Sequence, residues 1–179
     1  MDLPPLVIMG VSGTGKTLIG RRLAAELGAV FVDADDLHSQ DNKDKMRSGV
    51  PLDDEDRWPW LKSVASELIA TPPPVVACSA LRRSYRDYLR AQAPATFFVH
   101  LTGDREIIVE HLARRSHEFM SPTLVDSQLE TLEPLAVEEA HFLAPIDLSP
   151  DEVSRYIIER LPQGSRPEPH ATRPPPTPI

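Results

Sequence analysis

Eight consecutive residues near the start of this 179-residue chain constrain its fold more than any other feature. They match G-x-x-x-x-G-K-[S/T] at every fixed position and are Gly10, Val11, Ser12, Gly13, Thr14, Gly15, Lys16 and Thr17. An apolar run precedes them at Leu6–Met9, and apolar residues at helical spacing follow over Lys16–Leu27. A loop that joins a strand to the start of a helix in this way directs its backbone N–H groups towards phosphates. The motif therefore predicts a bound nucleoside triphosphate. We expect Lys16 to reach the β- and γ-phosphates, and Thr17 to ligate Mg²⁺.

Short apolar runs alternate with amphipathic segments along the rest of the chain, which is typical of a parallel α/β sheet covered on both faces. Strands are expected at Leu6–Met9, Val30–Val32, Val75–Cys78, Thr96–Leu101 and within Ala140–Leu148. Helices are expected at Lys16–Leu27, Asn42–Ser48, Asp53 to about Ala70, Arg83–Gln92, Asp104–Arg114, Leu124–Leu132 and Pro150–Leu161. Residues 1–161 are therefore predicted to form one domain with a lid at about 115–125, and the proline-rich tail 162–179 to be disordered.

Charge and cysteine content exclude several classes of protein. The formal net charge is -8 and the pI about 5.2, which disfavours nucleic acid or an anionic membrane as a partner. The first five residues lack the features of a signal peptide, and the longest apolar runs are too short to span a membrane. The single cysteine, Cys78, cannot form an intrachain disulfide. These features together predict a cytoplasmic protein.

An acidic run, Asp33-Ala34-Asp35-Asp36, follows the second predicted strand. The carboxyl ends of strands in open α/β sheets face the ligand crevice, and alternation along an extended segment would put Asp33 and Asp35 on one side. Phosphoryl transfer to a hydroxyl requires a carboxylate that orients the acceptor, and Mg²⁺ prefers oxygen ligands. A solvated acidic turn is the alternative, but the neighbouring phosphate-binding loop favours a functional interpretation.

Further residues resemble those of the gluconokinase family. The resemblance rests on the loop at 10–17, Asp33-x-Asp35-x-x-His38, the block from Asn42 to Leu61, and Cys78-Ser79-Ala80-Leu81-Arg82 with Tyr85-Arg86. It covers nearly all of residues 6–161 and implies an α/β three-layer P-loop NTPase fold, with a five-stranded parallel sheet of order 2-3-1-4-5, helices on both faces and a lid. It also implies ATP- and Mg²⁺-dependent phosphorylation of D-gluconate at its 6-hydroxyl, supplying the pentose phosphate or Entner–Doudoroff routes, by a homodimer.

The resemblance implies roles for single residues as well. Lys16, Asp33, Asp35 and Arg115 would be catalytic: Asp35 would orient the 6-hydroxyl, Asp33 would hold Mg²⁺ with Thr17, and Arg115 on the lid would stabilise the transferring phosphoryl group. A carboxylate is bound best by the planar fork of arginine, so Arg57 is the first candidate for the carboxylate of gluconate. The full set of substrate-binding candidates is Asp35, His38, Lys45, Arg57, Ser79, Arg82 and Arg86.

Several of these residues have structural alternatives. Asp56 and Arg57 could form a surface ion pair, and His38 could cap a helix or be exposed. Trp58 and Trp60 are expected in core or hinge packing, and His100 is expected to be a satisfied core histidine. The lid also departs from the family pattern Arg-x-x-His-Phe, because Arg115-Ser116-His117-Glu118-Phe119-Met120 has its histidine one place early.

Two other functions compete with the gluconokinase interpretation, because the loop alone does not distinguish kinases from other nucleotide-binding proteins. A shikimate kinase typically carries Gly-Gly-Gly after the third strand, where this chain has Ser79-Ala80-Leu81. A regulatory nucleotide-binding module without turnover would be favoured by loss of acceptor-side carboxylates or lid arginines. Because Asp33, Asp35, Arg114 and Arg115 are present, the enzyme is the favoured hypothesis.

Overall fold

The computed structural model describes residues 3–48, 50–70, 72–114 and 122–162. Within this part of the chain, one sheet has five parallel strands in the order β2-β3-β1-β4-β5. The strands are β1 (Leu6–Met9), β2 (Val30–Asp33), β3 (Pro74–Ala77), β4 (Phe97–Thr102) and β5 (His141–Pro145). The predicted fold class and strand order are therefore confirmed; the bounds of β1 were predicted correctly, and the ends of the other strands differ from the predicted ends by at most three residues.

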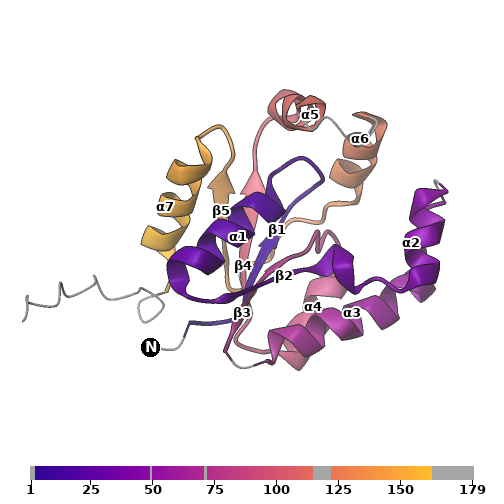
Figure 1. Ribbon diagram of the computed structural model, residues 1–179, viewed down its shortest axis with the longest axis horizontal. Helices are drawn as coiled ribbons and strands as arrows, with labels where there is room; N and C mark the ends of the chain where they lie inside the picture. Colours follow the sequence, from indigo (N-terminus) through magenta and orange to yellow (C-terminus); the bar gives the residue numbers. More distant parts are fainter. Residues whose placement is uncertain (1–2, 49, 71, 115–121, 163–179) are drawn as a thin grey trace, which may run out of the picture.

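Helices follow the strands and cover both faces of the sheet (Figure 1). They are α1 (Lys16–Leu27), α2 (Gln40–Arg47), α3 (Asp54–Leu68), α4 (Arg83–Gln92), α5 (Arg105–Ala113), α6 (Pro122–Thr131) and α7 (Pro150–Arg160), with a 3₁₀ turn η1 at Ala34–Leu37. α1 and α7 pack on one face, and α3 and α4 pack on the other. None of the helices in the described ranges is long and apolar enough to cross a membrane.

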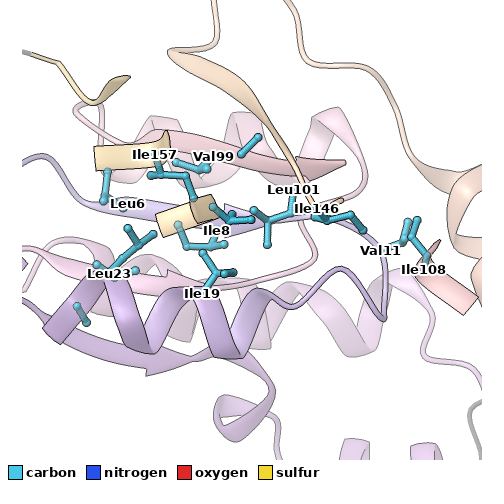
Figure 2. Packing of buried hydrophobic residues seen from close by; sticks show 14 of the residues in the cluster. Leu6, Ile8, Val11, Ile19, Leu23, Val99, Leu101, Ile108, Ile146 and Ile157 are labelled. Atoms are coloured by element: carbon cyan, nitrogen blue, oxygen red, sulfur yellow. The ribbon is translucent and has the colours of Figure 1, made fainter. Parts of the chain in front are cut away.

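The central strand β1 divides the hydrophobic core into two clusters. Its side chains alternate between the faces: Leu6 and Ile8 pack with residues of α1 and α7, and Val7 and Met9 pack with residues of α3 and α4. Figure 2 shows the first cluster, in which Ile8 lies between Ile19 of α1 and the neighbouring strands. All four β1 residues are buried, so the strand fixes where the following loop leaves the sheet.

The residues after β2 differ from expectation. Asp33 accepts a hydrogen bond at Oδ1 from the Asp35 backbone N–H at 3.2 Å and so caps the 3₁₀ turn at Ala34–Leu37. The prediction that Asp33 and Asp35 share one side of an extended segment is therefore wrong, because a side-chain cap replaces the extended backbone with a turn. Of the lid predicted at about 115–125, residues 115–121 lie outside the described residues, and residues 122–125 belong to α6. The tail from residue 163 also lies outside the described residues.

Candidate active site

The loop between β1 and α1 has the backbone that a phosphate-binding site requires. Gly13 has φ of +91°, and a Cβ atom there would lie 2.8 Å from Leu112 Cγ and 2.9 Å from the Ile108 carbonyl oxygen. Gly15 occupies the N-cap of α1 with φ of 91°, and no side chain of the described residues caps that helix. The first N–H groups of α1 therefore face outward from a helix N-terminus, where an anion is stabilised.

The side chains of the loop fold back on the loop itself. Lys16 Nζ donates to the Val11 carbonyl oxygen at 3.1 Å, and Thr14 Oγ1 donates to the same oxygen at 2.9 Å. The Lys16 ammonium group thus lies over the loop, where phosphate oxygens would be its stronger partners.

Thr17 and Asp33, the two predicted Mg²⁺ ligands, lie together. Thr17 Oγ1 donates to Asp33 Oδ2 at 2.9 Å, so the start of α1 meets the end of β2. No cluster of three or more His, Cys, Asp or Glu side chains with metal-binding geometry occurs in the described part of the chain. A hydroxyl beside one carboxylate fits Mg²⁺, which typically takes few protein ligands and keeps waters and phosphate oxygens.

Three predicted catalytic side chains lie near Cys78, the residue that follows β3. Burial is the main cause that raises the pKa of Cys78 to about 12; a backbone hydrogen bond at Ala80 and the charge of Lys16 oppose it, and the charges of Asp35 and Asp33 add to it. These three predicted catalytic side chains therefore lie close to one strand end. Cys78 is a buried neutral thiol, as expected from the sequence.

His38 is held between η1 and α3 by an aromatic stack. Its ring lies 4.6 Å from the ring of Trp60, at an interplanar angle of 8°. The Trp60 indole Nε1 donates to the Ala34 carbonyl oxygen at 2.7 Å, which fixes α3 against η1. His38 and Trp60 are both buried, so the alternative of an exposed His38 is excluded, and the core placement of Trp60 is confirmed. Trp58 is 41% exposed and packs edge-on against the Tyr85 ring, so it is not a core residue.

The proton on His38 can be assigned from its neighbour. Asn42 Nδ2 donates to the Asp56 carbonyl oxygen at 2.9 Å and lies 3.4 Å from His38 Nδ1. An amide nitrogen can only donate, so Nδ1 accepts and Nε2 carries the proton. Burial lowers the pKa of His38 to about 4, with smaller effects from Lys43 and Arg57. His38 is therefore a neutral imidazole with one N–H donor beside the acidic turn.

Arg57 and Arg82, two of the predicted carboxylate ligands, meet around Asp54. Arg82 Nη1 donates to Asp54 Oδ1 at 3.1 Å, Tyr85 donates to the same oxygen at 2.6 Å, and Arg57 Nη1 lies 3.7 Å from it. The Tyr85 hydrogen bond, followed by the charges of Arg82 and Arg57, holds the pKa of Asp54 below its usual value. The two arginine side chains remain 30% and 41% exposed, so this arrangement can bind a carboxylate from solution.

Lys45, a predicted substrate-binding residue, forms an ion pair with Asp56, the residue that the sequence suggested as a partner of Arg57. Lys45 Nζ donates to Asp56 Oδ1 at 2.6 Å and Oδ2 at 2.8 Å, which ties α2 to α3. Asp56 also completes a capping box with Asp53 at the start of α3. The alternative of an Asp56–Arg57 surface pair is therefore not what the structure shows, and Lys45 can reach a substrate only by leaving Asp56.

The prediction that Arg86 contacts substrate requires correction. Its side chain is 0% exposed and forms an ion pair with Glu139, which is equally buried. Ser79 is half-buried, and its carbonyl oxygen accepts a hydrogen bond from Gly10 N–H at 3.4 Å, next to the phosphate-binding loop. Arg115 lies outside the described residues.

Gln128 is a contact of the loop that sequence reasoning missed. The Ser12 backbone N–H donates to Gln128 Oε1 at 2.6 Å, so α6 is attached to the middle of the loop. The two residues are 116 positions apart, and no motif connects them. Only the fold reveals this contact.

Comparison with known proteins identifies the family of the chain. Residues 12–162 match the shikimate kinase family. The chain is 42% identical over 170 residues to a probable gluconokinase of Dictyostelium discoideum, covering 87% of this chain and 85% of that protein. It is 43% identical over 149 residues to the thermosensitive gluconokinase of Escherichia coli K12, covering 81% and 79%. The crystal structure of a gluconokinase from Sinorhizobium meliloti 1021 aligns with a TM-score of 0.80, at 41% identity, over 86% of this chain and 89% of that one.

Proposed function

The chain belongs to the gluconokinases within the shikimate kinase family, and on that premise we propose that it transfers the γ-phosphoryl group of ATP to the 6-hydroxyl of D-gluconate. The products are ADP and 6-phospho-D-gluconate. Kinase activity follows from the family, and the choice of acceptor is argued from the side chains below.

One chain of contacts carries the proposal, because it links the phosphate-binding loop to an arginine pair. Thr17 contacts Asp33, and the turn that Asp33 caps is fixed to α3 by Trp60. Arg57 lies in α3 about one turn before Trp60, and Arg57 and Arg82 meet at Asp54. An acceptor that carries a hydroxyl at one end and a carboxylate at the other fits such a site.

Each predicted residue except Arg86 has a place in this proposal. The loop amides and Lys16 would bind the β- and γ-phosphates, and Thr17 with Asp33 would hold Mg²⁺, which neutralises phosphate charge when bound. Asp35 would accept a hydrogen bond from the 6-hydroxyl and orient it, and Arg57 with Arg82 would bind the carboxylate. The remaining groups, His38 Nε2–H, Ser79 and Lys45, are candidates for the hydroxyls in between. Arg115 keeps its proposed role at the transferring phosphoryl group.

A direct assay tests the proposal. The purified chain would be given MgATP and, separately, D-gluconate, other sugar acids and shikimate, and ADP release would be measured. We expect gluconate-dependent turnover, with the phosphate on C6 by ¹³C and ³¹P NMR. ADP release no greater than the acceptor-free background with gluconate would defeat the proposal, and preferential turnover of shikimate would reassign the acceptor.

Three further properties stay predictions of the sequence and its resemblance. They are a homodimer, a cytoplasmic location, and supply of 6-phosphogluconate to sugar acid breakdown. Light scattering after size-exclusion chromatography tests the first of these, with twice the chain mass of 19.9 kDa as the expected result.

A further inference from the structure

Arg86 of α4 and Glu139, between α6 and β5, form an ion pair in the protein interior. Both side chains are 0% exposed, with Arg86 Nε donating to Glu139 Oε2 at 2.6 Å and Nη2 donating to Oε1 at 3.2 Å. Burial opposes the ionisation of Glu139, yet hydrogen bonds from Arg86 and the Ala136 N–H keep its pKa below the usual value. Buried pairs of this kind often add nothing to stability over apolar packing, so the pair calls for another explanation.

The guanidinium of Arg86 uses all five of its N–H donors. Besides the two bonds to Glu139, Nη1 donates to the Ala80 and Leu81 carbonyl oxygens at 3.1 Å each, and Nη2 donates to the Pro134 carbonyl oxygen at 3.1 Å. A lysine has three donors on one atom and cannot span these partners. Arg86 therefore joins two loops, the turn between β3 and α4 and the segment after α6.

The turn that Arg86 holds has a conformation that its sequence disfavours. Ala80 has φ of 47°, in the left-handed region that residues with a Cβ atom rarely adopt, and it is buried. Such a conformation persists when surrounding contacts determine it. The bonds from Arg86 to the Ala80 and Leu81 carbonyl oxygens are contacts of this kind, and the Glu133 N–H adds a bond to the Leu81 carbonyl oxygen at 2.9 Å.

The same turn contacts both the phosphate-binding loop and the acceptor side of the candidate active site. Immediately before Ala80, the Ser79 carbonyl oxygen accepts from Gly10 N–H of the phosphate-binding loop at 3.4 Å. Two residues after Ala80, Arg82 forms the N-cap of α4 and reaches Asp54 at 3.1 Å. A change in the turn would therefore move the acceptor side relative to the phosphate-binding loop.

We propose that Arg86 and Glu139 are a positioning pair, which fixes the turn between β3 and α4 so that the acceptor is aligned with the phosphate-binding loop. The proposal rests on the proposed function for the identity of the acceptor. Neither side chain contacts substrate, because both are enclosed. Their effect is exerted through the carbonyl oxygens of Ala80 and Leu81, and hence through the placement of Ser79 and Arg82.

Kinetics of conservative variants test the proposal. Arg86→Lys keeps the charge but loses the fork, and Glu139→Gln keeps the shape but loses the charge. We expect kcat/KM for gluconate to fall about 100-fold in Arg86→Lys, because a misplacement of about 1 Å has that effect, while the Kd for ATP changes less than about threefold. Leu89→Ala, in the same helix and fully buried, is the matched control: it should lower Tm without this selective loss.

Cys78 gives a second readout that needs no acceptor. It is the single cysteine of the chain, it is buried, and it lies two residues before Ala80. Loosening the turn should expose it, so labelling of the native protein by a thiol reagent should be faster in Arg86→Lys than in Leu89→Ala. Adding Ala80→Gly to Arg86→Lys should restore part of kcat/KM, because glycine adopts the left-handed conformation without the bonds from Arg86.

The outcomes separate this proposal from the proposed function. Absence of gluconate turnover by the wild-type chain defeats the proposed function, and the labelling rates still test the pair. Unchanged kcat/KM and unchanged labelling in Arg86→Lys and Glu139→Gln would overturn the positioning role. The positioning role would also be overturned if Arg86→Lys and Glu139→Gln lost ATP and gluconate binding to the same extent as Leu89→Ala. If Arg86→Lys does not fold, the positioning role is tested with Glu139→Gln, alone and combined with Ala80→Gly, by the same kinetic and labelling measurements.

Discussion

The nucleotide side and the acceptor side of this site are built in opposite ways. The nucleotide side is eight consecutive residues whose backbone N–H groups would bind the phosphates, and β1 and α1 fix them. The acceptor side is assembled from η1, α3 and the turn before α4, and its side chains bind one another: His38 stacks on Trp60, and Arg57 and Arg82 share Asp54. A backbone site is specified locally, whereas a side-chain site depends on the tertiary fold.

The largest expected effect separates chemistry from nucleotide binding. Asp35→Asn removes the charge that would orient the acceptor hydroxyl, and we expect kcat to fall about 1,000-fold, within the usual range for such a carboxylate. The Kd for ATP, measured by calorimetry, should hardly change. Asp36→Asn, an exposed neighbour, is the control and should behave as wild type. Retention of most of the kcat by Asp35→Asn would remove Asp35 from the mechanism.

The next effect is confined to the nucleotide side. Gly13→Ala places a Cβ atom 2.8 Å from Leu112 Cγ in a residue with φ of +91°, and we expect the Kd for ATP to rise about 100-fold from strain and overpacking. Gly28→Ala is a matched control, because Gly28 also has positive φ (+64°) but has no neighbour within 4 Å in the described residues. It should lower Tm and leave the Kd for ATP unchanged, and equal ATP affinities in the two variants would contradict the account.

A smaller effect is confined to the acceptor side. Arg57→Ala removes one guanidinium from the proposed carboxylate site, and we expect the KM for gluconate to rise about 30-fold, as for loss of one partner of a charge pair. The KM for ATP should stay within about twofold. Arg47→Ala removes a surface arginine that pairs with Asp44 and serves as the control. An unchanged gluconate KM in Arg57→Ala would move carboxylate binding to Arg82.

The smallest effect is a loss of stability in acid. Burial lowers the pKa of both His38 and His100 to about 4, well below the value of about 6.5 in an unfolded chain. The unfolded state then binds more protons below pH 6.5, so stability is complete above that pH and falls as the pH drops towards 4. Thermal unfolding at pH 7.5 and 5.0 would measure the loss.

Variants of the two histidines assign that loss to regions of the molecule. His38→Gln and His100→Leu should each reduce the difference in Tm between the two pH values, because each removes a buried group that must take up a proton. Only His38→Gln should also raise the KM for gluconate, since His100 is a buried residue of β4 whose Nδ1 has no partner in the described residues. An unchanged pH dependence in both variants would exclude burial of these imidazoles as the cause.

The same division separates what the sequence could predict from what it could not. The loop and most element boundaries were predictable, because hydrophobic periodicity and a contiguous motif encode them locally, and the strand order was predicted from the resemblance to gluconokinases. The turn after Asp33 was not predictable, because the Asp33 carboxylate caps a 3₁₀ turn where an extended segment was expected. Arg86 was misinterpreted as a substrate ligand, since its partner Glu139 lies 53 residues away. Gln128 gave no sequence signal at all.

The account rests on recognition of a carboxylate by Arg57 and Arg82, and one comparison of substrates tests it most directly. D-Glucitol has the hydroxyl chain of D-gluconate with a CH₂OH group in place of the carboxylate. We expect the wild-type chain to prefer gluconate by about 100-fold or more in kcat/KM, and Arg57→Ala to lose most of that preference. Equal turnover of gluconate and glucitol by the wild-type chain would contradict the account.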